Sequence, residues 1–294
     1  MLEGIPADRL GPPVPDRERM NAQIPRRIIQ TSKNLDLPVL EKAVVRNLKL
    51  LNPDFEYVHF DDRQVEEFVD KEFPEYRQLF DSFPVRIQKY DFFRYLAVYR
   101  LGGFYFDTDV LLAENLSELV GYGCVFPFES LSINAYLRDE YSMDWEIGNY
   151  AFGASPGHPF ILAIIENCIR AQKDPGWVRL MSRSVPRMFF EDYEVLFTTG
   201  PLLVSRTLAG FPGANKHVKV LFPPDVCDPR YWNRFGHFGV HLRQGGWRVE
   251  KRFLKTRMQR YWELFMAKRL YARSRAMGKQ RSLEFKSERQ PPAG

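Results

Sequence analysis

Along residues 24–250, hydrophobic residues recur with the period of a strand in some segments and with the period of a helix in others. A period of two in short runs predicts strands over Arg26–Gln30, Phe55–Phe60 and Phe104–Phe106, because successive strand side chains point to opposite faces. Further strands are predicted near Cys124–Phe128, Ala151–Ala154 and Val195–Thr198. Helical spacing, capping residues and prolines predict helices over Pro38–Leu51, Asp61–Phe73, Tyr76–Phe83 (helix or turn), Pro84–Leu101, Pro159–Gln172 and the residues after Pro201.

This alternation of strands and helices predicts an α/β fold with a mainly parallel central sheet and helices on both faces. The segments Ser130–Asn149 and Lys173–Asp192 show no clear period, so we expect long loops there. Residues 1–23, where Gly11 and three prolines cluster among mixed charges, predict a flexible N-terminal arm. The expected organisation is therefore an arm over 1–23, a globular domain over 24–250 and a separate segment over 251–294.

The segment 251–294 differs from the rest in charge. It holds 13 Lys or Arg against 3 Glu, a net charge of +10, so residues 1–250 carry −5 of the total of +5. A helical stripe of apolar residues runs through its first part, which predicts a basic amphipathic helix that either contacts an anionic membrane, over about 251–270, or packs on the core. Nucleic-acid binding is not expected, because no recognition motif accompanies the charge. The stripe consists of Leu254, Met258, Tyr261, Phe265 and Leu270.

Composition places the domain among globular proteins of a reducing compartment. At 45% hydrophobic and 15% aromatic residues the chain has ample core material, and no apolar run is long enough for a membrane span or a signal peptide. The three cysteines are far apart and fit no metal pattern. We therefore expect a cytoplasmic protein, peripheral on the inner face of the membrane if the basic segment binds lipid.

The strongest chemical signal is an aromatic strand that ends in two carboxylates. Phe104–Phe106 follows Gly102-Gly103 and leads directly to Asp107 and Asp109. Ligands of α/β sheets bind where strands end. Two carboxylates this close repel each other unless a cation compensates them, and Mn²⁺ or Mg²⁺ prefers such oxygen ligands. The pair therefore predicts a metal site for a diphosphate, although an isolated pair of this kind is often a solvated acidic turn.

The helix before this strand carries a second pair of charges. Asp91 and Arg94 are three residues apart and share a helix face, among many aromatic and aliphatic residues. They form either an ordinary intrahelical ion pair or a functional pair, because ionised groups in a buried helix need partners.

The segments Lys89–Tyr95 and Tyr99–Asp109 together resemble the signature of glycosyltransferase family 32, whose enzymes carry an Asp-x-Asp motif. The family includes the initiating α-1,6-mannosyltransferase and bacterial polysaccharide or capsular enzymes. The resemblance implies a GT-A-like nucleotide-diphospho-sugar transferase fold and metal-dependent transfer of a hexose with retention of configuration. Four further segments extend it over about residues 24–247: Ile24–Thr31, Asn149–Pro159, Thr198–Pro201, and His241 with Gly246-Trp247.

The chemistry of a nucleotide-sugar enzyme suggests roles for the two carboxylates. A metal must neutralise the diphosphate leaving group, and we expect Asp109 to bind it directly. Asp107 either holds the ribose or reaches the metal through water.

The resemblance implies further site residues. It assigns the nucleotide base to Ile28, Gln30 and Thr31, and the donor sugar and its phosphate side to Asp91 and Arg94. It also places Asn149 near the sugar, although Asn149 could equally be an ordinary polar residue at the entrance of a strand. His241 is expected at the metal or diphosphate, with His237 as a competitor, and Trp247 on the nucleotide, although the family's serine before this tryptophan is absent.

The expected partners are a UDP- or GDP-hexose donor and a glycan or lipid-linked acceptor, with Mn²⁺ or Mg²⁺ as cofactor. One alternative is a haloacid-dehalogenase-like phosphatase with Asp107 as nucleophile. That class needs the motif on its first strand and an acid pair downstream, and neither is found. The other alternative is a non-catalytic, basic-tailed binding protein, which leaves the four charged residues of the site unexplained.

Overall fold

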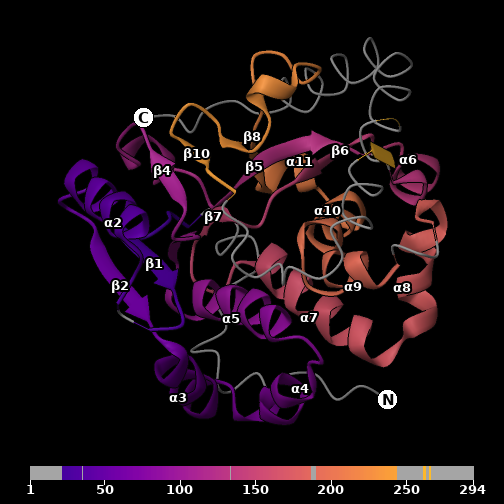
Figure 1. The fold of residues 1–294 in the computed structure, drawn as a ribbon, viewed down its shortest axis with the longest axis horizontal. Coiled ribbons are helices and arrows are strands. Elements are labelled where there is room, and N and C mark those ends of the chain that lie inside the picture. Colours follow the sequence, from indigo (N-terminus) through magenta and orange to yellow (C-terminus); the bar gives the residue numbers. More distant parts are fainter. Residues whose placement is uncertain are drawn as a thin grey trace.

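The protein forms a central mixed sheet in this computed structural model, which describes residues 22–34, 36–132, 134–186, 190–243, 261–262 and 265 (Figure 1). The order is β2-β1-β3-β7-β5-β6, and β8 pairs with β5. Strands β1, β2 and β3 are parallel, β7 runs against both β3 and β5, and β6 runs against β5. The strands are β1 (Arg27–Thr31), β2 (Glu56–Phe60), β3 (Gly103–Phe106), β5 (Cys124–Leu131), β6 (Trp145–Ile147), β7 (Ala151–Ala154) and β8 (Lys219–Leu221).

A small second sheet follows β3 and supports the residues that leave it. Its order is β4-β10-β9, all antiparallel. It consists of β4 (Val110–Leu112), β9 (Arg234–Phe235) and β10 (Gly239–His241). The loop that carries Asp107 and Asp109 joins β3 to β4, so one of its ends is anchored in the central sheet and the other in this small sheet.

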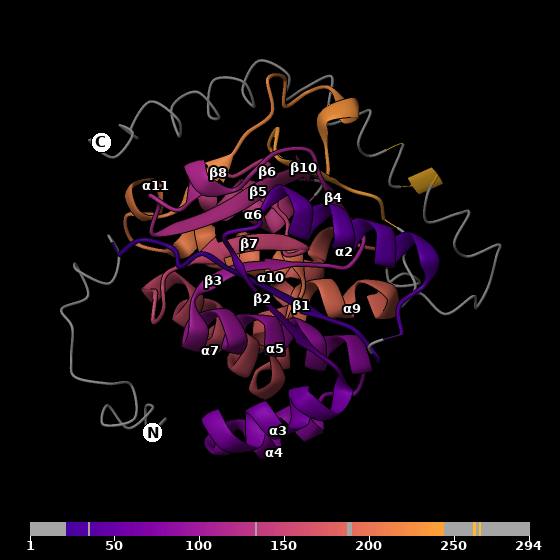
Figure 2. The same ribbon diagram turned by 90° about the vertical axis from the view of Figure 1, so that its left-hand side faces the viewer.

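Helices cover both faces of the central sheet. Figure 2 shows α5 and α7 on one side and α2 on the other. The described helices are α2 (Val39–Leu51), α3 (Asp62–Glu72), α4 (Arg77–Ser82), α5 (Arg86–Leu101), α6 (Ala135–Tyr141), α7 (Pro159–Lys173), α8 (Pro175–Met181), α9 (Phe190–Thr198), α10 (Pro201–Gly210) and α11 (Ala214–His217). The predicted α/β class and the mainly parallel sheet are confirmed, since β7 and β6 are the only strands of this sheet that run against the others in the described part of the chain.

The side chains of β3 divide between two hydrophobic clusters. Phe104 and Phe106 pack with residues of α2 and β4 in the smaller cluster, whereas Tyr105 belongs to the larger cluster under α5, α7 and α10. This is the alternation expected of a strand that is buried on both faces. It directs the Tyr105 ring toward α5 and leaves its hydroxyl near the end of the strand.

Three sequence predictions about secondary structure were wrong. Val195–Thr198 lies in helix α9, where the Tyr193 and Phe197 rings stack four residues apart. A short apolar run does not distinguish a buried helix from a strand. The two expected loops also contain elements: Ser130–Asn149 includes α6 and β6, and Lys173–Asp192 includes α8.

The termini lie largely outside the described residues. The predicted arm over 1–23 is described only from residue 22, and of the predicted basic helix only residues 261–262 and 265 are described. Tyr261 and Phe265 are 75% and 60% exposed, while Trp262 packs against the Tyr193 ring. Within the described chain, every helix is too short or too polar to cross a bilayer.

Gly103 allows β3 to start close beside β1. Its φ is +107°, and a Cβ atom there would lie 2.6 Å from the backbone oxygen of Arg27. We expect Gly103→Ala to lower the free energy of unfolding by at least about 2 kcal/mol, because it combines backbone strain with a steric clash. Gly210→Ala is the control, since its Cβ would meet nothing nearer than 3.7 Å. Equal denaturation midpoints for the two variants would contradict the argument.

Candidate functional site

The ends of several strands meet at one edge of the sheet. The parallel strands β1, β2 and β3 end there at Thr31, Phe60 and Phe106. Because β7 is antiparallel to β3, its entrance, with Asn149 and Tyr150, lies at the same edge. The topology therefore brings together residues that the sequence separates by more than a hundred positions.

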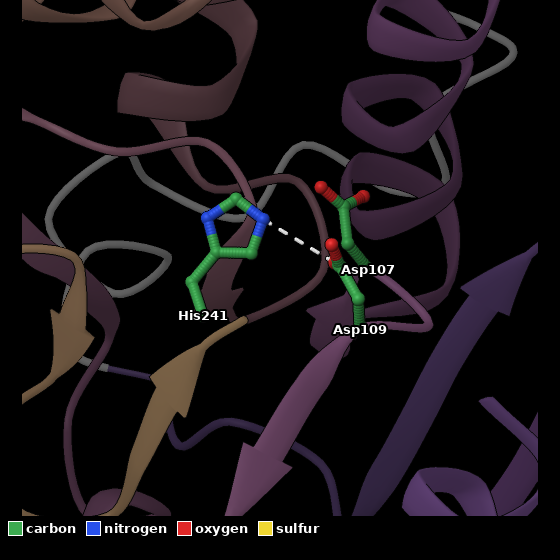
Figure 3. Close-up of side chains that lie close together, drawn as sticks. All are labelled: Asp107, Asp109 and His241. Carbon is green, nitrogen blue, oxygen red and sulfur yellow. Dashed lines mark ion pairs between the residues drawn. The ribbon is translucent and has the colours of Figure 1, made fainter. Parts of the chain in front are cut away.

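Asp107, Asp109 and His241 converge at this edge (Figure 3). One candidate ligand atom of each lies within 4.8 Å of the others, and Nε2 of His241 is 3.3 Å from Oδ1 of Asp109. The pairing of β10 with β4 causes this approach, since His241 is opposite Val110 and the Leu242 amide donates to the Asp109 carbonyl. The two carboxylates suit Mn²⁺ or Mg²⁺, and the imidazole nitrogen favours the transition metal Mn²⁺ of the two.

Arg94 bridges the two acidic groups that the sequence analysis treated separately. Its guanidinium lies 3.1 Å from Oδ1 of Asp91 and 3.3 Å from Oδ1 of Asp107, and it donates to the Asn149 carbonyl. It also lies over the Tyr105 ring, 4.7 Å from the centroid. The intrahelical ion pair therefore exists, and it extends to the first carboxylate of the motif.

The carboxylates keep this arginine charged despite its burial. Burial alone would lower the pKa of the Arg94 guanidinium, but Asp107 and Asp91, together with tyrosine hydroxyls, outweigh it and raise the pKa. Burial raises the pKa of Asp91 to about 6, and the positive charge of Arg94 opposes that effect. We therefore treat the three groups as one charged network.

Asp91 has hydrogen-bond donors on both oxygens. The Thr199 hydroxyl donates to Oδ2 at 3.0 Å, and the Asn149 amide donates to Oδ1 at 3.2 Å. The same amide donates to the Tyr95 hydroxyl, which donates to the Thr199 carbonyl. Asn149 is thus part of a buried network and not an isolated polar residue at a strand entrance.

The motif loop is held by contacts from β1 and β3. The Asp107 amide donates to the Tyr150 carbonyl at 2.8 Å, and the Tyr105 hydroxyl donates to Oδ1 of Asp107 at 2.9 Å. Gln30, which is fully buried, donates to the Asp107 carbonyl and accepts a hydrogen bond from Tyr57. Thr31 contacts the Tyr105 hydroxyl at 3.1 Å.

These contacts define what the predicted base-binding residues do in this structure. Gln30 and Thr31 position the motif loop, and the Ile28 side chain is buried in the smaller core cluster. Contact of these three residues with a nucleotide base stays a prediction. Trp247 lies outside the described residues.

Sequence reasoning missed several residues of the site. Tyr105 could have been found, because it is two positions before Asp107 and shares its side of the strand. Tyr150 could not, since its ring stacks on His241, with centroids 4.3 Å apart, only after β10 has paired with β4. Likewise, Tyr95 meets Asn149 and Thr199 only after α5 has packed against β7 and α9.

Residues 38–126 match the family model described as "Glycosyltransferase sugar-binding region containing DXD motif". The matched region extends from the start of α2 into β5 and includes Asp91, Arg94, Asp107 and Asp109. The motif lies on the third strand of the chain in the described residues, which disfavours the haloacid-dehalogenase alternative.

Curated relatives are similar over part of their length. Inositol phosphoceramide mannosyltransferase 3 of Schizosaccharomyces pombe is 29% identical over 185 residues, which is 63% of this chain and 45% of that protein. The initiation-specific alpha-1,6-mannosyltransferase of the same organism is 25% identical over 170 residues, or 53% and 41%. The chain thus spans about half the length of the relatives it matches. Among solved structures, the PaToxG glycosyltransferase has a TM-score of 0.41 at 13% identity, covering 66% of this chain and 73% of that one.

The Arg94 network generates a stability prediction. We expect Arg94→Gln to lower the free energy of unfolding by roughly 3–5 kcal/mol, because it leaves the buried Asp91 and Asp107 without their cation. Arg94→Lys keeps the charge and should cost less. Urea denaturation measures both. The control is Arg100→Gln on the same helix, where the side chain is 42% exposed and pairs with Glu72, so the loss should be below about 1 kcal/mol. A similar loss in Arg94→Gln and Arg100→Gln would contradict the network.

Proposed function

We propose that this protein transfers a hexose from a nucleotide-diphosphate sugar to a glycan or glycolipid, because residues 38–126 match the model of a glycosyltransferase sugar-binding region with a DXD motif. The observation that carries the proposal is the convergence of Asp107, Asp109 and His241 beside the buried Arg94 pair. Asp109 and His241 would bind a divalent cation directly, with Asp107 as a further ligand or as a contact to the ribose.

The cation would supply electrostatic neutralisation of the nucleoside diphosphate as it leaves. Side chains of this chain perform the positioning. Arg94 holds Asp107 and Asp91 in one arrangement, and Tyr105 and Gln30 hold the motif loop. Such preorganised groups need not rearrange as charge develops, which is the main source of electrostatic catalysis.

Retention of configuration is part of the proposal. Both oxygens of Asp91 accept hydrogen bonds, and Oδ1 of Asp107 accepts one from Tyr105 while it faces Arg94. These contacts engage three of the four carboxylate oxygens, and we assign neither aspartate a nucleophilic role. Retention without an enzymic nucleophile then requires the acceptor to approach on the face that the nucleotide leaves.

Mannose and a lipid-linked acceptor are our leading candidates. The relatives named above are mannosyltransferases, and one of them is named for inositol phosphoceramide. The candidate donors are GDP-mannose, UDP-glucose and UDP-galactose. We further propose a cytoplasmic enzyme that meets the inner face of a membrane through its basic segment, residues 251–294, whose net charge is +10.

The metal assignment predicts the effect of Asp109→Asn. We expect loss of the Mn²⁺-dependent thermal stabilisation by GDP or UDP and a fall in turnover of about a hundredfold or more, because an anionic ligand is removed without a change of shape. Asp107→Asn should also be severe, chiefly through donor affinity. Asp139→Asn, on the exposed face of α6, is the matched control and should behave as wild type. Near-normal turnover in Asp109→Asn would exclude the assignment.

The basic segment predicts binding to anionic vesicles. Neutralising five of its cations while keeping the apolar stripe should reduce binding to phosphatidylglycerol vesicles, and salt should have the same effect, since exposed charges are screened over roughly 10 Å at 0.1 M. The five are Lys255, Arg257, Arg260, Lys268 and Arg269.

The matched control for this experiment neutralises five cations elsewhere on the surface. It should leave co-sedimentation with the vesicles unchanged. If wild-type protein ignores anionic vesicles at low salt, the membrane proposal fails. The control residues are Arg63, Lys71, Arg179, Arg183 and Lys216.

A further inference from the structure

A second polar cluster lies at the same edge of the sheet as the DXD motif. Strand β5 ends at this edge because it runs in the direction of β3, and β6 pairs with its last residues. Glu146 of β6 is opposite Ser130 of β5, and the register shifts between Phe128 and Ser130, so that Glu129 is the extra residue of a bulge. Bulges redirect a side chain, and they occur often beside active sites.

The carboxyl group of Glu146 is held in an unusual state. Burial raises its pKa to about 8, the hydrogen bond that it accepts from the Ser132 hydroxyl at 2.5 Å opposes this, and the charge of Glu129 adds to the rise. Near neutral pH this carboxyl therefore keeps a proton, and it can both donate and accept a hydrogen bond.

Tyr150 is a second, independent sign of a ligand. The residue is 3% exposed, and within the described part of the chain its buried hydroxyl has no hydrogen-bond partner. A Cβ atom placed on Gly148 would lie 2.5 Å from Cε1 of Tyr150 and 2.9 Å from Oε2 of Glu129. The ring edge next to the hydroxyl and the Glu129 carboxylate therefore both lie beside the Cα atom of Gly148.

This cluster is joined to the DXD site by short backbone and ring contacts. The Tyr150 carbonyl accepts the hydrogen bond of the Asp107 amide, and the Tyr150 ring stacks on His241. The Asn233 amide donates to the Glu129 carbonyl, and the Asn233 carbonyl accepts from the His241 amide. The two groups of side chains are therefore neighbours on one rigid edge.

We propose that Glu129, Glu146 and Tyr150 form the binding subsite for the hydroxyl groups of the acceptor, a sugar or cyclitol ring. This rests on the proposed glycosyltransferase function. Hydroxyl groups both donate and accept hydrogen bonds, which matches a carboxylate, a proton-bearing carboxyl and a phenol. An anionic group would be repelled by the Glu129 carboxylate, and an apolar group would leave the Tyr150 hydroxyl without a partner.

The test separates acceptor binding from donor chemistry. Nucleotide release from GDP-mannose and UDP-glucose is measured with Mn²⁺, with and without millimolar myo-inositol, methyl α-mannoside or methyl α-glucoside. In the wild type at least one polyol should accelerate release and be glycosylated. Glu146→Gln, Glu129→Gln and Tyr150→Phe should raise the KM for that polyol about tenfold, the loss expected for one hydrogen bond. The two glutamate variants, which do not touch the DXD residues, should also leave hydrolysis without polyol nearly unchanged.

Controls distinguish this subsite from a structural or metal-binding role. Glu118→Gln, an exposed carboxyl, should leave every parameter unchanged. The inference is overturned if the three variants keep the KM for the polyol, or if hydrolysis in the two glutamate variants falls in parallel with transfer. It is also overturned if wild-type enzyme hydrolyses the donor and accepts no polyol. Loss of stabilisation by Mn²⁺ without nucleotide in the variants would indicate a cation site and would likewise overturn it. Absence of both hydrolysis and nucleotide-dependent thermal stabilisation in the wild type refutes the proposed function itself, and the subsite with it.

Discussion

The burial of one arginine between two aspartates constrains the whole site. A guanidinium removed from water costs several kcal/mol unless carboxylates compensate it at hydrogen-bond distance. Arg94 meets this condition with Asp91 on its own helix and with Asp107 on the loop after β3. Helix α5 and strand β3 must therefore lie in one relative position, and the same contact places Asn149 at the guanidinium. The position of the first motif carboxylate thus follows from the packing of α5.

The charge balance around this arginine favours a cation. Asp91, Asp107 and Asp109 outnumber Arg94, and Nε2 of His241 lies 3.3 Å from Asp109. Close carboxylates destabilise one another unless a positive charge lies between them. A divalent ion with a diphosphate would supply both the missing charge and the missing ligands. On our proposal, the same excess of negative charge would both limit the stability of this edge and attract the metal.

Two carboxyl clusters at one sheet edge differ in their environment. The motif aspartates face a guanidinium and an imidazole, whereas Glu146 is half-buried beside another glutamate and has a raised pKa of about 8. Environments that separate the protonation states of neighbouring acids assign them different tasks. On our proposal the motif aspartates would bind a metal, and Glu146 would bind hydroxyl groups of the acceptor. Tyr150 contacts the motif cluster through its ring and its carbonyl, and it lies near Glu129 beside Gly148.

Local sequence determined much of this protein. Alternation of β and α patterns predicted the fold class, and the glycine pair before β3 marked the start of the motif strand. The spacing of the charged residues in α5 and after β3 indicated the chemistry; these residues are Asp91, Arg94, Asp107 and Asp109. Each of these signals depends on residues a few positions apart. Tertiary structure decided the rest. The helical state of α9, the approach of His241 to Asp109 and the meeting of Glu129, Glu146 and Tyr150 depend on packing and strand pairing between segments far apart in the chain. No local period or motif encodes such distances, since they follow from the way in which separate segments bury their surfaces against each other.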